Sequence, residues 1–341
     1  MGTEEGGINA TPADEGLVHN RGLIGEKRAS GAYRKWGLAL GGGGLKGAAH
    51  VGVLKVLERE GLVPDVLSGT SAGAVVASLY CSGLSAADIE RRILDLIGSD
   101  PEGLGEVWEA NGLFSSPRDR LSFVIGSRFP KPFIRAVFSI KGVMSGERVE
   151  KTLDRVLERK TFNEVTRPLA VEAVDLHTAE LVAFVTPGSI REDLKTRDLV
   201  YIYDAKLSEA VRASISVPVL FVPKEYKGRH LVDGGVKDNV PVGILRQMGA
   251  NVVVAVDLGK PGPSGEYDNA LSILIRSLEM TGREMTLIKL QVAADLVMTP
   301  DVGGVGHLEV GRIPELIKKG EETCLEALPR IREMVYMTHR V

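Results

Sequence analysis

Two glycine-rich turns, one of which carries a serine, hold the residues of this sequence best suited to chemistry. The segment 69–73 (GTSAG) has the G-x-S-x-G spacing of a nucleophile elbow, which holds the hydroxyl of Ser71 exposed at a tight corner between a strand and a helix. The segment 41–44 (GGGG) precedes another helical pattern, where backbone N–H groups and the helix dipole favour an anion. A nucleophile and an anion site on neighbouring turns indicate acyl transfer, which also requires a base.

Histidine is the usual base for a serine nucleophile, and the chain has 6 histidines. Four stand where a base is not expected, at the chain ends, in a turn or inside a predicted helix that favours surface or core packing: His19, His50, His177 and His339. His230 and His307 remain possible. His307 lies in a glycine-rich loop late in the chain, as the order Ser–Asp–His requires.

Asp233 is the stronger candidate base, because Asp233-Gly234-Gly235 ends a predicted hairpin and its glycines permit close backbone approach. Asp-Gly often makes only a turn, but here the serine elbow and the glycine turn already require a base. A carboxylate with the ordinary pKa of about 3.9 is a weak base near neutrality. Desolvation inside a cleft would raise that pKa. Asp175 and Asp257 also lie near strand ends, where caps or turns explain them better.

The first glycine turn also satisfies G-x-G-x-x-G, from Gly42 to Gly47, which is the fingerprint of dinucleotide binding. The acid that such a site needs belongs at the end of the second strand, but Asp65 precedes that strand and Ser71 follows it. The phosphate-loop pattern fails as well, since Ala48 follows Gly47. We therefore assign the N–H groups of this loop to an oxyanion.

Composition limits the class of protein. A net charge of −3 argues against a general nucleic-acid surface. Cys81 and Cys324 lie in apolar helical patterns, which predicts buried free thiols rather than a disulfide. No run reaches the roughly 18 apolar residues of a membrane span, and acidic residues stand where a signal peptide would be positive. We expect a cytoplasmic protein whose contact with the inner membrane surface is peripheral.

Short apolar strands alternate with amphipathic helices, which predicts a three-layer α/β/α fold with a mostly parallel central sheet. Residues 1–34 are expected to form a mobile leader, and residues 35–341 one domain whose last helices occupy 268–337. The predicted strands are 37–40, 66–68, 169–174, 181–185, 219–226, 229–232, 252–256 and 296–298. The predicted helices are 45–60, the segment from the elbow to 83, 85–98, 145–160, 207–214, 241–248, 269–291 and 314–335.

Residues 98–142 differ from the rest and are interpreted as a lid-like insertion. Five of the 8 phenylalanines fall here, and six basic residues stand against one acid, Asp119, between 114 and 141. The rings could simply fill a side cluster of an irregular insertion. Aromatic and basic residues together also suit an anionic lipid surface, so 114–141 is the segment expected to contact a membrane.

Four blocks of the chain, in order, resemble the motifs of the patatin-like phospholipase family. They are Gly42-Gly43-Gly44-Leu45-Lys46-Gly47, Gly69-Thr70-Ser71-Ala72-Gly73, Ala213-Ser214-Ile215-Ser216-Val217-Pro218 and Asp233-Gly234-Gly235. The resemblance covers about 36–258 and implies a Ser–Asp dyad without histidine, metal or cofactor. It implies Ser71 as nucleophile and Asp233 as proton acceptor. It further implies that Gly42, Gly43 and Gly44 donate to an oxyanion, that Gly47, Gly69, Gly73, Gly234 and Gly235 are motif glycines, and that Ser214 and Pro218 are structural.

We therefore expect a serine hydrolase that cleaves lipid acyl esters, of phospholipase A or lysophospholipase type, through an acyl-enzyme. A transacylase or thioesterase with the same dyad is an alternative, because another acceptor can capture the same intermediate. A Ser–His–Asp esterase that uses His307 is a second alternative. Two alternatives belong to a different functional class: a lipid-binding protein without turnover, and a dinucleotide-binding module.

Overall fold

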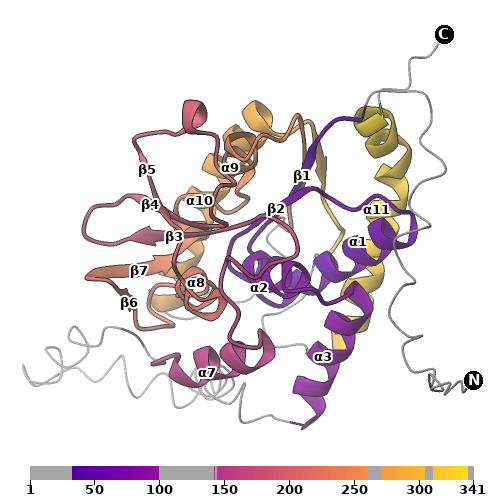
Figure 1. The fold of residues 1–341 in the computed structure, drawn as a ribbon. Helices are drawn as coiled ribbons and strands as arrows, with labels where there is room; N and C mark the ends of the chain where they lie inside the picture. The colour runs from indigo at the N-terminus through magenta and orange to yellow at the C-terminus, as the bar shows by residue number, and fades with distance from the viewer. Residues whose placement is uncertain (1–32, 100–141, 143, 260–269, 304–309, 337–341) are drawn as a thin grey trace, which may run out of the picture.

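The computed structural model describes residues 33–99, 142, 144–259, 270–303 and 310–336, which form a central sheet with helices on both faces (Figure 1). The predicted leader up to residue 32, the basic segment 114–141 and His307 lie outside the described residues. The last two residues assigned to the leader contact the folded body. Tyr33 donates its hydroxyl to Asp65 Oδ2 at 2.6 Å, and the Arg34 N–H donates to the carbonyl of Val335 at 2.9 Å.

One mixed sheet holds all the described strands, and seven of them run in the order β5-β4-β3-β2-β1-β8-β9. Neighbours from β3 through β9 in this order are parallel, whereas β4 is antiparallel to β3. The strands are β1 (Trp36–Leu40), β2 (Val66–Gly69), β3 (Leu169–Asp175), β4 (Leu181–Val185), β5 (Leu199–Ile202), β6 (Lys224–Tyr226), β7 (Arg229–Asp233), β8 (Val252–Val256) and β9 (Leu296–Met298). The prediction of a mostly parallel central sheet is confirmed.

The two edges of β3 decide where the ends of β2 and β7 meet. β4 pairs along one edge, at 170–174. On the other edge β2 pairs with Leu169–Val171, and β7, running antiparallel, pairs with Ala173–Asp175. β7 thus occupies the edge of β3 beyond the point where β2 stops. The last residue of β7, Asp233, is therefore brought to the end of β2, from which the serine elbow departs.

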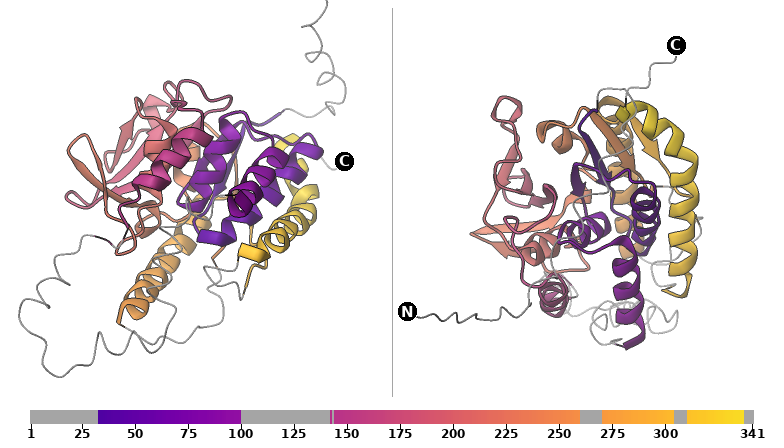
Figure 2. Two further views of the ribbon diagram at one scale, coloured as in Figure 1. Left: turned by 90° about the horizontal axis from the view of Figure 1, so that it is seen from below. Right: turned by 45° about the vertical axis from the view of Figure 1, so that its right-hand side comes forward.

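Helices cover both faces of the sheet (Figures 1 and 2). They are α1 (Ala48–Arg59), α2 (Ala72–Cys81), α3 (Ala86–Ser99), α7 (Glu147–Val156), α8 (Leu207–Ser214), α9 (Val242–Gln247), α10 (Ala270–Ala293) and α11 (Ile313–Tyr336). One core cluster packs residues of α1, α2, α8 and α11 against one face of the sheet, and a second packs α9 and the end of α10 against the other. This arrangement gives the three layers that the sequence predicts.

Two glycines bring α1 and α11 together. A Cβ on Gly52 would lie 1.9 Å from the carbonyl oxygen of Ile317, and one on Gly320 would lie 1.9 Å from that of Ala49. Such contacts leave no space for any side chain. The long C-terminal helix therefore packs directly on the backbone of the helix that follows the first glycine turn, as Figure 1 shows for α1 and α11.

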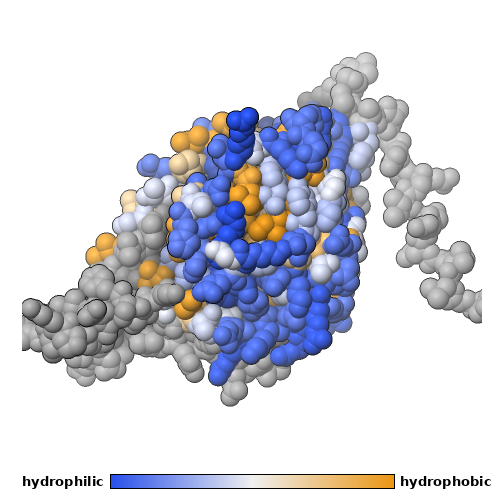
Figure 3. Space-filling view, turned by 60° about the vertical axis from the view of Figure 1, so that its left-hand side comes forward, coloured by the Kyte–Doolittle hydropathy of each residue, from blue (hydrophilic) through white to orange (hydrophobic). Residues whose placement is uncertain are grey.

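The sheet ends at β5, an edge strand that the sequence analysis missed. The face that carries β4 to β7 is mainly hydrophilic (Figure 3), and ion pairs such as Lys227 with Asp204 lie on it. Charged side chains near an edge strand oppose pairing with another chain.

No helix of the described chain combines the length and the apolar character needed to cross a membrane.

Most predicted element bounds agree with the structure to within a few residues, and three differ for local reasons. The helix after the glycine turn opens with a 3₁₀ turn at Gly44–Gly47. The predicted strand 219–226 begins only at Lys224, since Val219 has a positive φ of 73°. The helix expected at 145 begins at Glu147, whose N–H donates to Ser145 Oγ at 3.3 Å. Cys81 and Cys324 are buried free thiols, as predicted.

Candidate active site

Ser71 occupies a strained corner between β2 and α2. Its φ of 52° and ψ of −120° lie outside the regions that L-residues ordinarily adopt. The corner can form because the flanking glycines lack side chains. A Cβ on Gly73 would lie 2.0 Å from the carbonyl oxygen of Leu40, and one on Gly69 would lie 2.5 Å from that of Gly73. The G-x-S-x-G spacing is thus a steric requirement of the turn, and it leaves the Ser71 side chain partly exposed.

The end of α8 holds the backbone of this corner. The N–H of Ser71 donates to Ser214 Oγ at 2.9 Å, and that hydroxyl donates to the carbonyl of Glu172, in β3, at 2.6 Å. Ser214 is fully buried, so each bond replaces a contact with water that the fold has removed. Ser214 therefore connects the elbow to β3, which agrees with the structural role that the resemblance implies.

Asp233 ends β7, and its carboxylate lies close enough to the Ser71 side chain for the hydroxyl to lower the pKa of Asp233. The N–H of Gly235 donates to Asp233 Oδ1 at 2.7 Å, and the N–H of Asp233 donates to the carbonyl of Ser216 at 2.9 Å. The side chain is 6% exposed. Burial raises the pKa of Asp233 to about 6, while the Gly235 N–H and the Ser71 hydroxyl act against this rise. The group can therefore exchange a proton near neutral pH.

The other two aspartates considered as bases have arginine partners. Asp175 accepts the N–H of His177 at 2.9 Å and pairs with Arg229 at 2.6 Å. Asp257 accepts the N–H of Gly259 at 3.0 Å and pairs with Arg283 at 2.5 Å. Both are buried turn residues with a fixed cation, as the sequence analysis favours. Among the described residues, Asp233 has no ion pair within 4.0 Å.

The glycine turn after β1 lies next to the serine, but one of its N–H groups is already used. The N–H of Gly42 donates to the carbonyl of Asn239 at 2.9 Å. The expectation that Gly42 donates to an oxyanion stays a prediction, and it would require this N–H to leave the Asn239 carbonyl. The N–H groups of Gly43 and Gly44 donate to no other residue in the part of the chain that the structure describes. They begin a helix, where the dipole adds to the attraction for an anion.

The three described histidines make their hydrogen bonds away from Ser71. His50 is fully buried in α1, and its Nε2 donates to the carbonyl of Gly41 at 2.7 Å. Burial lowers the pKa of His50 to about 4, so the ring is neutral near pH 7. His177 Nε2 and His230 Nδ1 bond to one another at 2.9 Å. His307, the histidine of the alternative triad, lies outside the described residues.

Three residues close to the site were missed or undervalued in the sequence. His50 Nε2 donates to the carbonyl of Gly41 in the glycine turn. The carbonyl of Asn239 accepts the N–H of Gly42, and the carbonyl of Ser216 accepts the N–H of Asp233. Ser216 belongs to the block 213–218, in which it was given no role, and Asn239 follows Asp233 by six residues, which is the signal that could have drawn attention to it. His50 has no such signal, because a histidine inside a helix usually has other roles.

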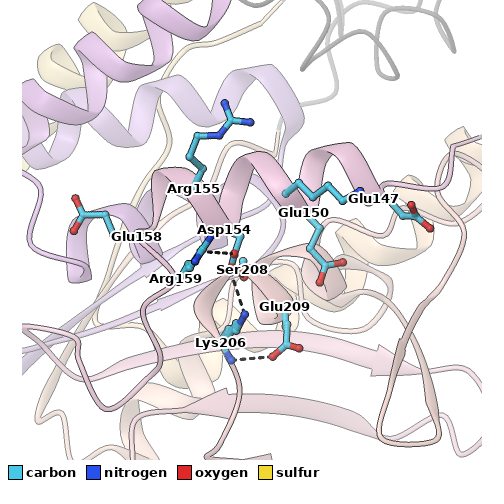
Figure 4. Close-up of a pocket in the computed structure, with 10 residues that line it drawn as sticks. Glu147, Glu150, Asp154, Arg155, Glu158, Arg159, Lys206, Ser208 and Glu209 are labelled. Carbon is cyan, nitrogen blue, oxygen red and sulfur yellow. Dashed lines mark hydrogen bonds and ion pairs between the residues drawn. The ribbon is translucent and has the colours of Figure 1, made fainter.

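A separate open cleft of about 610 Å³ lies between α7 and the start of α8 (Figure 4). Asp154 lies at its centre, where it accepts a hydrogen bond from Ser208 at 3.0 Å and pairs with Arg159 at 3.6 Å and Lys206 at 3.7 Å. Two other acids of the lining pair with residues outside it, Glu150 with Lys224 and Glu158 with Lys160. Ser71, Asp233 and the glycine turn are not part of its lining, so we assign it no role in the chemistry.

Comparison with known families decides the affiliation. A family model described as Patatin-like phospholipase matches residues 38–246, more than half of this chain. The chain belongs to the patatin-like phospholipase family. The matched segment of this patatin-like chain contains the glycine turn, the Ser71 elbow, the end of α8 and Asp233.

Several relatives carry related names. Patatin-like phospholipase domain-containing protein 6 of Homo sapiens is 26% identical over 274 residues, which cover 79% of this chain and 16% of that protein. Lysophospholipase NTE1 of Pyricularia oryzae is 25% identical over 322 residues, which cover 87% of this chain and 18% of that protein. An uncharacterized NTE family protein of Mycobacterium tuberculosis is 26% identical over 331 residues, which cover 89% of this chain and 48% of that protein.

This chain therefore spans less than half the length of each of these relatives. Among solved structures, the crystal structure of VipD from Legionella pneumophila covers 88% of this patatin-like chain, which in turn covers 68% of VipD. The two sequences are 19% identical and the TM-score is 0.47.

Proposed function

We propose that the chain hydrolyses an acyl ester of a phospholipid or lysophospholipid, with Ser71 as nucleophile and Asp233 as proton acceptor. The position of the Ser71 side chain next to the buried Asp233 carboxylate, close enough for the hydroxyl to lower the pKa of that carboxyl, carries this proposal. The names of the family and of the lysophospholipase relative support a lipid ester as substrate.

Asp233 is suited to the role of base by its surroundings. A base works best when its pKa lies near the operating pH, and burial raises the pKa of this carboxyl to about 6. Burial alone would raise the pKa of Asp175, but the His177 N–H and Arg229 hold it below its usual value, which makes this carboxylate a poorer proton acceptor. Asp257 is held in an ion pair with Arg283. Asp233 thus combines contact with the serine and a raised pKa.

In the proposed reaction, Ser71 Oγ attacks the ester carbonyl carbon while Asp233 takes the hydroxyl proton. The carbonyl oxygen becomes an oxyanion, which accepts hydrogen bonds from the N–H groups of Gly43 and Gly44. The C–O bond to the alcohol then breaks, and Asp233 returns its proton to the leaving oxygen. Water next attacks the acyl-enzyme carbonyl and gives a proton to Asp233. The bond from the acyl carbon to Ser71 Oγ then breaks, Asp233 returns this proton to Oγ, and the fatty acid is released.

The first test is the intact mass of the protein after exposure to a fluorophosphonate, which modifies activated serines. We expect one adduct on the wild type, none on Ser71→Ala and strongly slowed labelling of Asp233→Asn. Release of fatty acid from phosphatidylcholine and lysophosphatidylcholine vesicles should follow the same order. His307→Ala is the control, with the activity of the wild type expected. A fully active Asp233→Asn together with an inactive His307→Ala would replace the proposal with a Ser–His–Asp hydrolase.

A further inference from the structure

We infer that Asn239 is a positioning residue for the proposed reaction: it fastens the glycine turn to the turn that carries the proton acceptor, with the serine between them. The inference rests on the proposed function, and its test separates the two. Asn239 follows Asp233 by six residues and precedes α9. It lies outside the motif residues that the sequence analysis singled out.

Asn239 makes a reciprocal pair of hydrogen bonds with Gly42. Its carbonyl accepts the Gly42 N–H at 2.9 Å, and its side-chain Nδ2 donates to the Gly42 carbonyl at 3.4 Å. A Cβ on Gly42 would lie 2.5 Å from Asn239 Oδ1 and 3.1 Å from the Cβ of Ser71. The amide therefore packs against the glycine turn beside the nucleophile, and it does so only because residue 42 has no side chain.

The same side chain contacts the turn of the proton acceptor. A Cβ on Gly235 would lie 2.9 Å from Asn239 Oδ1 and 3.0 Å from Asp233 Oδ1. These two oxygens are consequently no more than about 6 Å apart, a distance at which a charge on one group shifts the pKa of the other. The neutral amide of asparagine fits this place without adding a charge next to Asp233.

The neighbouring residue extends the connection to the elbow. The carbonyl of Asp238 accepts the hydroxyl of Thr70, the residue before Ser71, at 2.9 Å. The Asp238 carboxylate pairs with Lys289 of α10 at 2.7 Å. Residues 238–239 thus contact the serine elbow, the glycine turn and the base turn together. Loss of the Asn239 side chain should let the oxyanion donors move relative to Ser71.

The decisive experiment is the rate of fluorophosphonate labelling measured between pH 4 and 9 for the wild type and two variants. Asn239→Asp has nearly the same size and adds a negative charge near Asp233. We expect the midpoint of its acid limb to rise by about one pH unit, because a like charge raises the pKa of a carboxyl. Asn239→Ala should label at least about tenfold more slowly at pH 8, with the midpoint of the wild type, because the donors are displaced without a new charge.

Asn251→Asp is the matched control. This exposed asparagine lies after α9, and its backbone carbonyl accepts a hydrogen bond from the Arg246 guanidinium at 2.8 Å. Its midpoint and rate should equal those of the wild type. Thermal melting shows whether each variant is folded. A purely structural role of Asn239 would lower the melting temperature without moving the pH midpoint of labelling. A wild-type midpoint in Asn239→Asp, or a wild-type rate in Asn239→Ala, overturns the inference. Absence of Ser71 labelling in the folded wild type would instead overturn the proposed function.

Discussion

Removal of the charge of Asp233 should make the protein more stable at neutral pH, although it removes the proposed base. Asp233→Asn keeps the size of the side chain and an oxygen that can accept the Gly235 N–H. What it removes is a carboxylate that is 6% exposed and has no ion pair among the described residues. A buried charge without a cation is costly, and active sites keep such groups at the expense of stability.

The size of the effect follows from the two pKa values. An aspartate carboxyl in an unfolded chain has a pKa of about 3.9, whereas the pKa of Asp233 in the folded chain is about 6. The folded state therefore binds the proton more tightly than the unfolded state, and the free energy of unfolding falls as pH rises from about 4 to about 6. Above pH 6 the wild type has lost about 3 kcal/mol, at about 1.4 kcal/mol for each pH unit. Asp233→Asn should regain an amount of this order at pH 7 and none of it below pH 4.

The assay is urea unfolding of the wild type and Asp233→Asn at pH 4, 5, 6 and 7. Asp175→Asn serves as a control of opposite sign. Burial alone would raise the pKa of Asp175, but the His177 N–H and Arg229 lower it below its usual value. Its charge therefore stabilises the fold above pH 4, and this contribution is lost as pH falls. Asp175→Asn should be less stable than the wild type at pH 7, by an amount that shrinks in acid.

Two results would refute this reasoning. One is an Asp233→Asn variant that is no more stable than the wild type at pH 7, which would mean that the carboxylate is well solvated or paired. The other is a gain that does not change between pH 4 and pH 7, which would trace the stabilisation to packing rather than to titration of Asp233.

Three further predictions concern the same site. The rate of Ser71 labelling should fall about tenfold between pH 7 and pH 5, since the ionised fraction of a base with a pKa of about 6 falls from about nine-tenths to about one-tenth; an unchanged rate would exclude this base. Ser214→Ala should cost about 1–3 kcal/mol in urea unfolding and slow labelling, because the N–H of Ser71 loses its acceptor; Ser78→Ala, which removes a buried hydroxyl without a hydrogen-bond partner among the described residues, should leave the labelling rate unchanged. Gly73→Ala should prevent folding to a soluble protein. Gly243→Ala, at a position where an added Cβ meets open space, should instead raise the free energy of unfolding by about 0.5–1 kcal/mol. A soluble, active Gly73→Ala variant would contradict the steric account of the elbow.

Local requirements made much of this fold predictable. Strand β8 was predicted with its observed bounds because five consecutive β-branched or small apolar residues, 252–256, suit a strand buried on both faces. Helix α8 was predicted equally well, since its apolar spacing ends shortly before Pro218. Strand β5 was missed because four residues at a sheet edge, 199–202, carry only a short pattern. The strand expected at 219–226 was too long, because a positive φ at Val219 is not visible in a pattern of apolar residues.

By itself, the sequence determined the two turns that carry the chemistry. At Gly69 the need for glycine follows from local chain geometry, because the missing Cβ would lie 2.5 Å from the carbonyl oxygen of Gly73. At Gly73 the need comes from the packing of the elbow on β1, because the missing Cβ would lie 2.0 Å from the carbonyl oxygen of Leu40. Only the tertiary structure decided which carboxylate meets the serine and which glycine N–H remains available. Both depend on the register of distant strands: β7 continues along β3 where β2 ends and delivers Asp233 to Ser71, and the segment after it places the carbonyl of Asn239 on Gly42.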